Sequence, residues 1–280
     1  MHKKTKFSII ILLLIILIVY YIFEDHSDIL RVCFINVGQG DSIFIKTPQN
    51  KNILIDGGPS ADLVQKIGQM HAYKNHKIDI LILTHAHADH YYGLIEIVKR
   101  YKIKLILWCG IDAHNSDYLY FKELIKDLDT KIAILGQEYL IEPNLRIKIF
   151  YPTHYLQEEE VTDLNNTSVS LILSYQNIDF WLAGDLTCEG EKEILEQNSN
   201  LESEIYKTNH HGSRWSNCDY ILDAIAPQIA IIQSGIDNTF GHPHQETLER
   251  LEQRNIKILR NDQVGDIWIY SDGEKYWVKK

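Results

Sequence analysis

Four side chains of the kinds that bind metal ions stand close together in the sequence: His85, His87, Asp89 and His90. The mostly apolar run Ile78–Leu83 comes just before them and is typical of a buried strand. Alternate side chains of an extended backbone point the same way, so the two imidazoles at 85 and 87 can reach one ion. The carboxylate and imidazole at 89 and 90 can serve a second ion where the chain turns. The spacing therefore predicts a metal centre just beyond the end of a strand.

Other groups of the same kinds also follow apolar runs: Asp185, the pair His210 and His211, and His242 with His244. Asp185 comes directly after a glycine, which suits a carboxylate that bridges two cations. Two metal ions about 3.5–4 Å apart can hold an attacking hydroxide and a substrate oxygen together. Imidazole and carboxylate ligands without cysteine favour Zn²⁺ and also admit Mn²⁺ or Fe.

Apolar runs rich in β-branched residues alternate with helical patterns after residue 29. The predicted strands are Leu30–Val37, Ser42–Lys46, Asn52–Asp56, Ile78–Leu83, Lys104–Leu107, Leu145–Tyr151, Ser168–Tyr175, Asp179–Ala183, Ile229–Gln233, Ile256–Leu259 and Asp266–Tyr270. The predicted helices are Ser60–Ala72, Gly93–Tyr101, Tyr118–Leu128, Glu189–Glu196, Asp219–Ala224 and His244–Arg254. This order predicts an α/β fold with mixed sheets covered by helices, in one domain over residues 30–280.

The segment 7–23 is dominated by Ile, Leu and Val. As a helix it would be about 26 Å long, close to the roughly 30 Å of a bilayer's hydrocarbon core. Three lysines lie in the tail 1–6, and acidic residues lie in the linker 24–29. The positive-inside rule therefore places the tail in the cytoplasm and predicts a single-pass membrane protein with an extracytoplasmic domain. A cleaved signal peptide is the alternative, but no small-x-small cleavage site follows Phe23.

The chain has four cysteines and no CxxC pair, so a thiolate zinc site is not indicated. Cys33 and Cys109 fall in strand-like runs and are expected in the core. A domain outside the cytoplasm permits a disulfide, but these spacings do not require one.

The chain is acidic, with 28 basic and 38 acidic residues and a formal net charge of −10. This balance argues against a general nucleic-acid binder, because phosphate neutralisation needs clustered lysines and arginines. Any anionic substrate must be held locally, most simply by a cation. The sequence has neither a GxxxxGK[ST] motif nor a Rossmann fingerprint, so no nucleotide cofactor is expected.

The segment Thr84–His90 resembles the signature of the metallo-β-lactamase superfamily of binuclear hydrolases. Flanking motifs narrow the resemblance: Asn36–Ser42, Leu54–Gly58, Asn165–Ser168, Gly184-Asp185, His210–Ser213 and Gly241–Pro243. Together they are similar to the C-terminal metallo-β-lactamase-like domain of ComEC-type DNA-uptake proteins, over essentially all of residues 30–280. The resemblance implies a four-layer αββα sandwich with its site at one edge, where the strand-end loops meet.

The resemblance also implies ligands for two divalent ions: His85 and His87 for the first, Asp89 and His90 for the second, and Asp185 as the bridge. A further histidine comes from the His-His-Gly motif, where we favour His211 over His210. Many superfamily hydrolases have one more histidine between the Asp-His pair and the bridging aspartate. Here that region offers Asn165 and Ser168, as in ComEC-like members, so the first ion is one ligand short.

Three more residues have two interpretations each. Asp41 and Asp56 can orient a ligand imidazole from behind, or can form ordinary turns beside glycines; the resemblance favours the orienting role. His242 can donate a proton to the leaving group or contact the substrate, or it can pack in a loop beside Pro243. The predicted catalytic residues are thus Asp89, Asp185 and His242.

We therefore expect a membrane-anchored hydrolase that uses two divalent ions, preferably Zn²⁺, and a metal-bridging hydroxide as the nucleophile. Phosphodiester or phosphoester bonds are the favoured target by analogy with relatives, and DNA is one candidate substrate. β-Lactam hydrolysis is less favoured, because the ComEC-like motifs lie outside that branch. The alternative is a non-catalytic DNA-uptake or surface-binding module on the same fold.

Overall fold

The computed structural model describes residues 11–13, 28–70, 76–157, 160–197 and 200–279. Residues 11–13 are helical, and the rest of the predicted anchor 7–23 lies outside the described residues. In the part of the chain that is described, no helix has the length and apolar character needed to cross a bilayer. The membrane anchor therefore stays a prediction.

The first sheet has eight strands in the order β17-β16-β1-β2-β3-β5-β7-β8. In that order the strands are Tyr276–Lys279, Ile267–Ser271, Leu30–Phe34, Ile43–Lys46, Asn52–Ile55, Ile80–Leu83, Ile106–Trp108 and Thr130–Ile132. Strands β3, β5, β7 and β8 run parallel, and the remaining pairs are antiparallel. The parallel strands bring their carboxyl ends to one edge of the sheet.

The second sheet has seven strands in the order β15-β14-β13-β12-β11-β10-β9. These are Lys257–Arg260, Ile229–Ile232, Ile205–Lys207, Ile178–Leu182, Ser170–Tyr175, Leu145–Tyr151 and Glu138–Glu142. Strands β12 to β15 are parallel, and β9 to β12 are antiparallel. A small sheet pairs β4 (Lys77–Ile78) with β6 (Lys102–Ile103).

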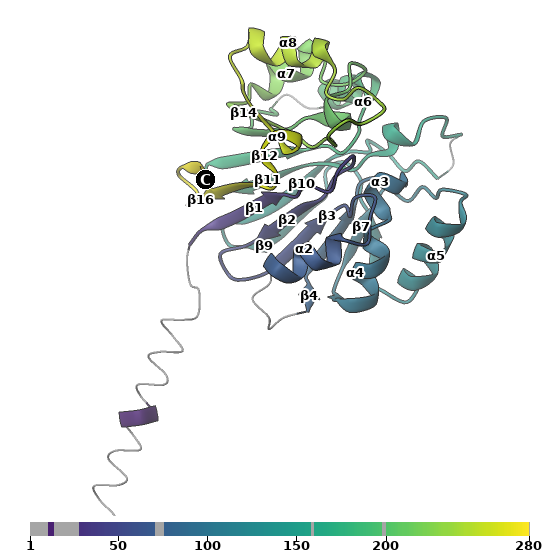
Figure 1. Ribbon diagram of the computed structural model, residues 1–280, viewed down its shortest axis with the longest axis vertical. Helices are drawn as coiled ribbons and strands as arrows, with labels where there is room; N and C mark the ends of the chain where they lie inside the picture. Colours follow the sequence, from purple (N-terminus) through teal and green to yellow (C-terminus); the bar gives the residue numbers. More distant parts are fainter. Residues whose placement is uncertain (1–10, 14–27, 71–75, 158–159, 198–199, 280) are drawn as a thin grey trace, which may run out of the picture.

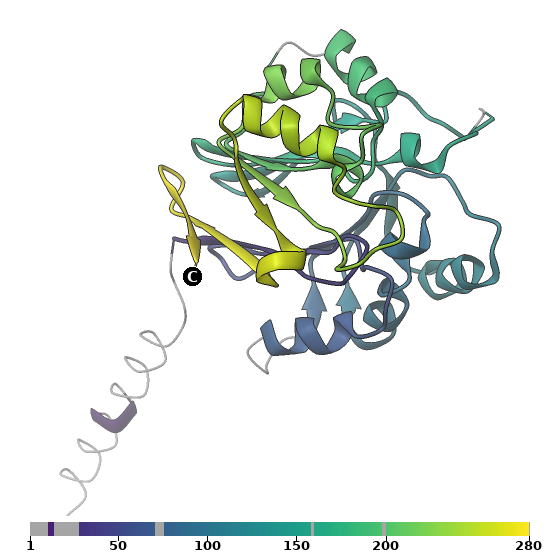
Figure 2. The ribbon, with the colours of Figure 1, turned by 45° about the horizontal axis from the view of Figure 1, so that its top comes forward.

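Helices cover the outer faces of both sheets, and the sheets face each other (Figures 1 and 2). Over the first sheet lie α2 (Leu63–Met70), α3 (Ala88–Tyr91), α4 (Leu94–Arg100) and α5 (Ser116–Ile125). Over the second lie α6 (Cys188–Gln197), α7 (Asp219–Ile225) and α8 (Gln245–Gln253). Short helical segments complete the list: α9 (Asn261–Val264), η1 (Leu164–Thr167) and η2 (Asn209–Gly212). The α/β fold with two mixed sheets expected from the sequence is confirmed.

The strands that lead into the candidate site are apolar on both faces because each separates two hydrophobic layers. In β5, Ile80 and Ile82 pack into the core between the sheets, while Leu81 and Leu83 pack under the helices of the first sheet. In β12, Phe180 faces the central core and its neighbour Trp181 packs under the other helices. Continuous apolar runs therefore mark the strands nearest to the site.

Most predicted elements have a counterpart with ends shifted by a few residues. The predicted strand over 78–83 is divided in the structure, since Asp79 separates β4 from β5. The list of predicted strands omitted β8, β9 and β17, which are three of the four edge strands of the two large sheets, and also the interior strand β13 and the short β6. Edge strands have one partner and one exposed side, so their sequences carry more polar residues and a weaker strand pattern.

A disulfide joins Cys188, the first residue of α6, to Cys218, which caps α7. The sequence analysis permitted a disulfide without predicting this pair. Cys33 and Cys109 are free and buried in the core, as expected.

This pairing predicts which cysteines react. Protein made under oxidising conditions, unfolded without reductant and treated with iodoacetamide, should be modified at Cys33 and Cys109 alone. Prior reduction should expose all four thiols, and peptide mass spectrometry would distinguish the two patterns. Modification of Cys188 and Cys218 without reductant would contradict the disulfide.

Candidate metal centre

Loops from both sheets meet at one edge and deliver the predicted ligands. The end of β5 leads to His85 and His87, and the helix α3 that follows carries Asp89 and His90. From the second sheet, β12 leads to Asp185 and β13 leads to His211 in η2. These six side chains thus come from three strand ends on two facing sheets.

Gly184 makes the turn after β12 possible. Its φ of +57° lies in the left-handed region, and a Cβ there would come within 2.9 Å of the Thr84 side chain. A glycine avoids both problems, because it has no Cβ. Asp185 can therefore follow the strand directly and lie against the loop that follows β5.

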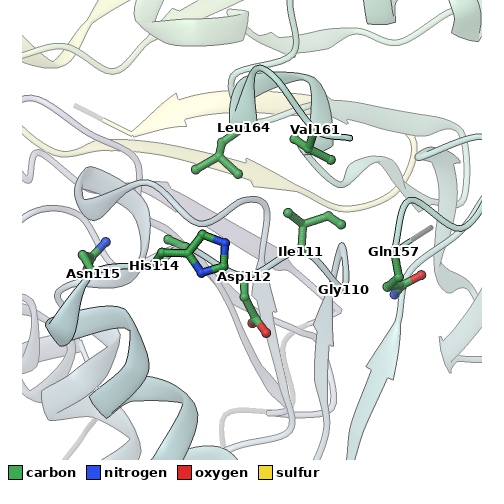
Figure 3. A pocket seen from close by; sticks show the side chains of 9 residues that line it. Gly110, Ile111, Asp112, His114, Asn115, Gln157, Val161 and Leu164 are labelled. Atoms are coloured by element: carbon green, nitrogen blue, oxygen red, sulfur yellow. The ribbon is translucent and has the colours of Figure 1, made fainter. Parts of the chain in front are cut away.

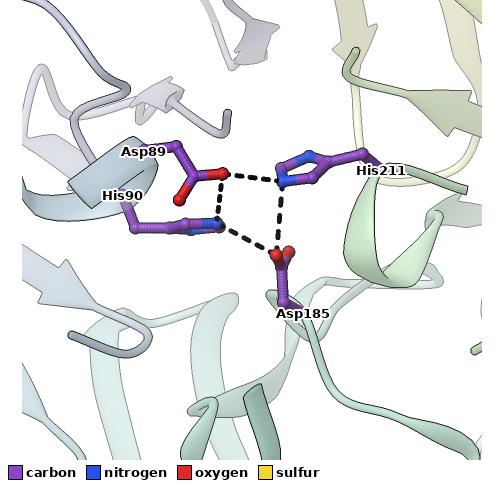
Figure 4. Close-up of side chains that lie close together, drawn as sticks. All are labelled: Asp89, His90, Asp185 and His211. Atoms are coloured by element: carbon purple, nitrogen blue, oxygen red, sulfur yellow. Dashed lines mark hydrogen bonds and ion pairs between the residues drawn. The ribbon is translucent and has the colours of Figure 1, made fainter. Parts of the chain in front are cut away.

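Four ligand atoms converge in the centre of the site (Figure 4). They belong to Asp89, His90, Asp185 and His211, and all lie within 4.8 Å of one another. Oδ2 of Asp185 is 3.2 Å from Nε2 of His90 and 3.2 Å from Nε2 of His211. Oδ2 of Asp89 closes the ring, at 3.2 Å from His211 Nε2 and 3.8 Å from His90 Nε2.

His85 and His87 form a second group beside this cluster. His85 Nε2 lies 3.0 Å from His87 Nδ1, and the His85 ring centroid is 4.1 Å from that of His90. Burial, followed by the nearby charge of His90, holds the pKa of His85 well below its ordinary value, so this imidazole is neutral. Two imidazole nitrogens that face each other at this distance suit one ion.

A buried carboxylate stands behind each histidine of the four-residue cluster. His90 Nδ1 donates to Asp56 Oδ2 (2.8 Å), and Asp56 also accepts from the backbone N–H and hydroxyl of Thr84 (2.8 and 2.7 Å). His211 Nδ1 donates to the Gln233 carbonyl (3.0 Å) and lies 3.2 Å from Asp41 Oδ1. Contacts of this kind fix the tautomer and the orientation of a ligand histidine.

The charges in the cluster compensate one another. Burial alone would raise the pKa of Asp185, but His211 and His90 hold it well below its usual range. Burial would lower both histidine pKa values, yet Asp185 and Asp56 raise that of His90, and Asp185 and Asp41 raise that of His211. In the metal-free protein both imidazoles are therefore doubly protonated and positively charged. A bound cation would replace one proton on each ring.

The remaining predicted residues lie around these groups. Ser168 accepts from the Asp185 backbone N–H (3.1 Å), and its hydroxyl is 3.3 Å from His85 Nδ1, the ring nitrogen opposite the one that faces His87. It thus supports His85 from behind. The Asn165 side-chain oxygen is buried and has no hydrogen-bond partner in the described part of the chain.

His210 and His242 lie at the rim. His210 Nε2 is 3.9 Å from Asp185 Oδ2, and its side chain is partly exposed. The His242 ring centroid is 5.3 Å from that of His210 and 5.9 Å from that of His211. The geometry thus favours His211 over His210 within the four-atom cluster.

The residues present fit a metal ion. Asp185 Oδ1 and His90 Nε2 are buried without a hydrogen-bond partner, and His90 Nε2 is the atom that lies 3.2 Å from Asp185 Oδ2 in the cluster. Buried polar atoms normally have partners, so such atoms in a group of imidazoles and carboxylates mark a place for a cation. A donor set of two imidazole nitrogens and two carboxylate oxygens suits Zn²⁺.

Two further residues support the site without having been predicted. Gln233 follows β14 directly and donates from Nε2 to the carbonyls of Ile35 and Ser42 (3.0 Å each). Lys207 is buried and forms an ion pair with Asp41. A polar residue at the end of an apolar strand was the available signal for both.

A cleft of about 760 Å³ lies at the carboxyl end of β7, the neighbour of β5 (Figure 3). Its lining includes Asp112, His114 and Asn115 from the loop after β7, and Leu164 from η1. Asn115 Oδ1 accepts from the hydroxyl of Tyr91 (2.7 Å), the residue that follows the predicted ligand His90. One wall of the cleft is thus tied to α3.

The family model described as the metallo-beta-lactamase superfamily matches residues 35–235, and the chain belongs to this superfamily. This match confirms the resemblance seen in the motifs. Together with the histidine and aspartate cluster, it defines the protein as a metal-dependent hydrolase.

Curated relatives carry names of the ComEC type. The chain is 30% identical to ComE operon protein 3 of Bacillus subtilis (strain 168) over 84% of this chain and 32% of the relative. It is 26% identical to Competence protein ComA of Neisseria gonorrhoeae over 82% of this chain and 30% of that protein. The chain spans about a third of the length of these relatives.

Solved structures share the fold at low identity. Igni18, a metallo hydrolase from Ignicoccus hospitalis, has a TM-score of 0.56 and 16% identity, over 85% of this chain and 98% of that chain. Zn²⁺-bound PqqB from Methylobacterium extorquens has a TM-score of 0.53 and 14% identity, over 79% and 85%.

The pKa shifts predict that zinc binding releases protons. His90 and His211 carry protons in the metal-free protein, so filling the cluster should release up to about two of them, and zinc affinity should rise with pH. Calorimetric titration in buffers of different ionisation enthalpy would count the protons. Asp185→Asn should reduce both the count and the affinity, whereas His114→Ala should change neither. Binding without proton release would show that the two histidines are neutral.

Proposed function

We propose that this chain is a membrane-anchored hydrolase of phosphodiester or phosphoester bonds that works with two divalent ions, Zn²⁺ or Mn²⁺. The observation that carries the proposal is the place of Asp185, which is 2% exposed and has one oxygen 3.2 Å from both His90 and His211. The His85–His87 pair lies on the side of His90. A carboxylate placed in this way suits a bridge between two ions.

Bound ions and the residues of the chain would have different roles in the reaction. Bound ions would supply a hydroxide nucleophile near neutral pH and would neutralise negative charge on the substrate. Asp56 and Asp41 stand behind Nδ1 of His90 and His211, so both Nε2 atoms stay directed at Asp185. Because these contacts are already in place, the ligand set needs little rearrangement to bind metal.

His242 is proposed to contact the substrate. Gln39 Nε2 donates to its Nδ1 (3.3 Å), which leaves Nε2 to carry the ring proton. Burial, with neighbouring histidines, lowers the pKa of His242 to about 3, so the ring is neutral at physiological pH. It therefore supplies a hydrogen bond to charge that develops on a leaving oxygen, and it is a poor source of a full proton.

Two considerations bear on the substrate. Names that refer to competence and recombination among the relatives favour a nucleic acid. The net charge of −10 argues against broad contact with a polyanion. We therefore propose a small phosphodiester as the first choice and DNA as the second.

The extracytoplasmic location is proposed from the charge pattern around residues 7–23. The Cys188–Cys218 pair supports it, because structural disulfides persist in oxidising compartments.

Loss of the bridging carboxylate should abolish turnover. With the full-length protein in detergent and Zn²⁺ or Mn²⁺, we expect Asp185→Asn to lower kcat/KM for bis-p-nitrophenyl phosphate by about 100-fold or more. Asp223→Asn, an exposed change on α7, is the matched control and should stay within about twofold of wild type. Single-stranded DNA assayed alongside would separate the two substrate classes.

Equal rates for wild type and Asp185→Asn would refute catalysis at this centre. That result would instead favour the non-catalytic DNA-uptake or surface-binding module.

A further inference from the structure

The loop that carries His211 has an unusual backbone. His210 and His211 have φ values of 49° and 53°, and Asn217, farther along the same loop, has a φ of 60°. Residues with a Cβ rarely adopt this left-handed conformation, and they keep it where surrounding contacts impose it. Contacts around the loop must therefore impose this conformation.

Glu191 of α6 supplies one set of these contacts. Its carboxylate is fully buried, and Oε1 accepts from the Asn217 backbone N–H (2.6 Å) and from Asn209 Nδ2 (2.7 Å). Oε2 accepts from the Cys218 backbone N–H (3.0 Å). Burial raises the pKa of Glu191 to about 7, and these three donors oppose that rise. Glu191 thus holds both ends of the loop 209–218.

The Asn217 side chain completes the network. Its Oδ1 accepts from the Tyr206 hydroxyl (2.7 Å) and from the Asn209 backbone N–H (2.9 Å). Its Nδ2 donates to the carbonyls of Asn209 (3.0 Å) and Ser213 (3.1 Å). The loop is therefore closed on itself by buried hydrogen bonds that begin at Glu191.

Helix α6, which carries Glu191, also begins shortly after Asp185 in the chain. Asp185 lies three residues before Cys188, the first residue of α6, and Cys188 is joined to Cys218 at the end of the His211 loop. The backbone N–H of Cys188 donates to the Trp215 carbonyl (2.8 Å). One helix thus connects the loop of Asp185 with the loop of His211, whose ligand atoms lie 3.2 Å apart.

We propose that Glu191 is a positioning residue that holds His211 against Asp185 and thereby sets the affinity of the ion that these two residues share with Asp89 and His90. Glu191 lies outside the ligand cluster and acts through the backbone of the loop. The inference rests on the proposed metal site, but it does not depend on which substrate is cleaved.

The test compares zinc affinities in full-length protein, measured by competition with a fluorescent chelator. Glu191→Gln replaces one acceptor oxygen by a donor, so at least one of the three N–H groups loses its partner. We expect the dissociation constant of one zinc step to rise by about 10- to 100-fold and the other step to stay unchanged. In a His87→Ala background the His85–His87 pair is incomplete, so only the zinc step of the four-residue cluster should remain. Glu191→Gln should weaken that step by the same factor.

Two variants distinguish positioning from general stability. Ile194→Ala on the same helix opens a gap in the buried core and should lower the melting temperature without changing either zinc step. Asn209→Ala removes a single hydrogen bond to Glu191 and should give a smaller loss at the same step, which keeps the test open if Glu191→Gln does not fold.

The results that test the role of Glu191 differ from those that test the proposed hydrolase activity. Unchanged zinc affinity in Glu191→Gln, or an equal loss in Ile194→Ala, would overturn the positioning role even if the wild type is active. A selective loss would support the role even if the wild type hydrolyses no phosphodiester. A wild type that binds neither zinc nor manganese would overturn both proposals.

Discussion

Buried negative charge is the constraint on which the site depends. Asp41, Asp56 and Asp185 are each at most 2% exposed, and Asp89 is only partly exposed beside them. Carboxylates that lose water at such close range repel one another and are costly unless cations or donors face them. Here two protonated imidazoles and the buried Lys207 face them in the metal-free protein. A divalent ion can replace the two imidazole protons and keep the charges balanced.

The sandwich is the frame that makes this concentration of charge possible. Residues from β5 and α3 belong to the first sheet, whereas Asp185 and His211 belong to the second, and the core between the sheets fixes their separation. Each ligand loop begins at the end of a strand that is buried on both faces. Close packing on both faces leaves such strands little room to move, so the loops begin at fixed positions.

The sequence predicts more of the site than of the strand order in the sheets. His85 to His90 form a local pattern, and Asp185 follows an apolar strand, so short-range rules are enough to find them. The partners of these residues are different: Lys207 meets Asp41 across 166 positions, and its place at the end of an apolar strand does not indicate which residue it pairs with. The edge strands β8, β9 and β17 likewise depend on a neighbour far along the chain, so their local sequence gives a weak signal.

The two ligand groups are unequal, and the cause lies in the segment around Ser168. His90 and His211 share Asp185 and Asp89, and each has a carboxylate behind it. Among the described residues, hydroxyl groups rather than a carboxylate stand behind His85: those of Thr84 and Ser168 lie 3.1 and 3.3 Å from Nδ1, the ring nitrogen turned away from His87. A serine there supports the imidazole but adds no ligand. The four-residue cluster is therefore the stronger cation site by charge, and the histidine pair depends on Asp185 and Asp89 for the negative charge near it.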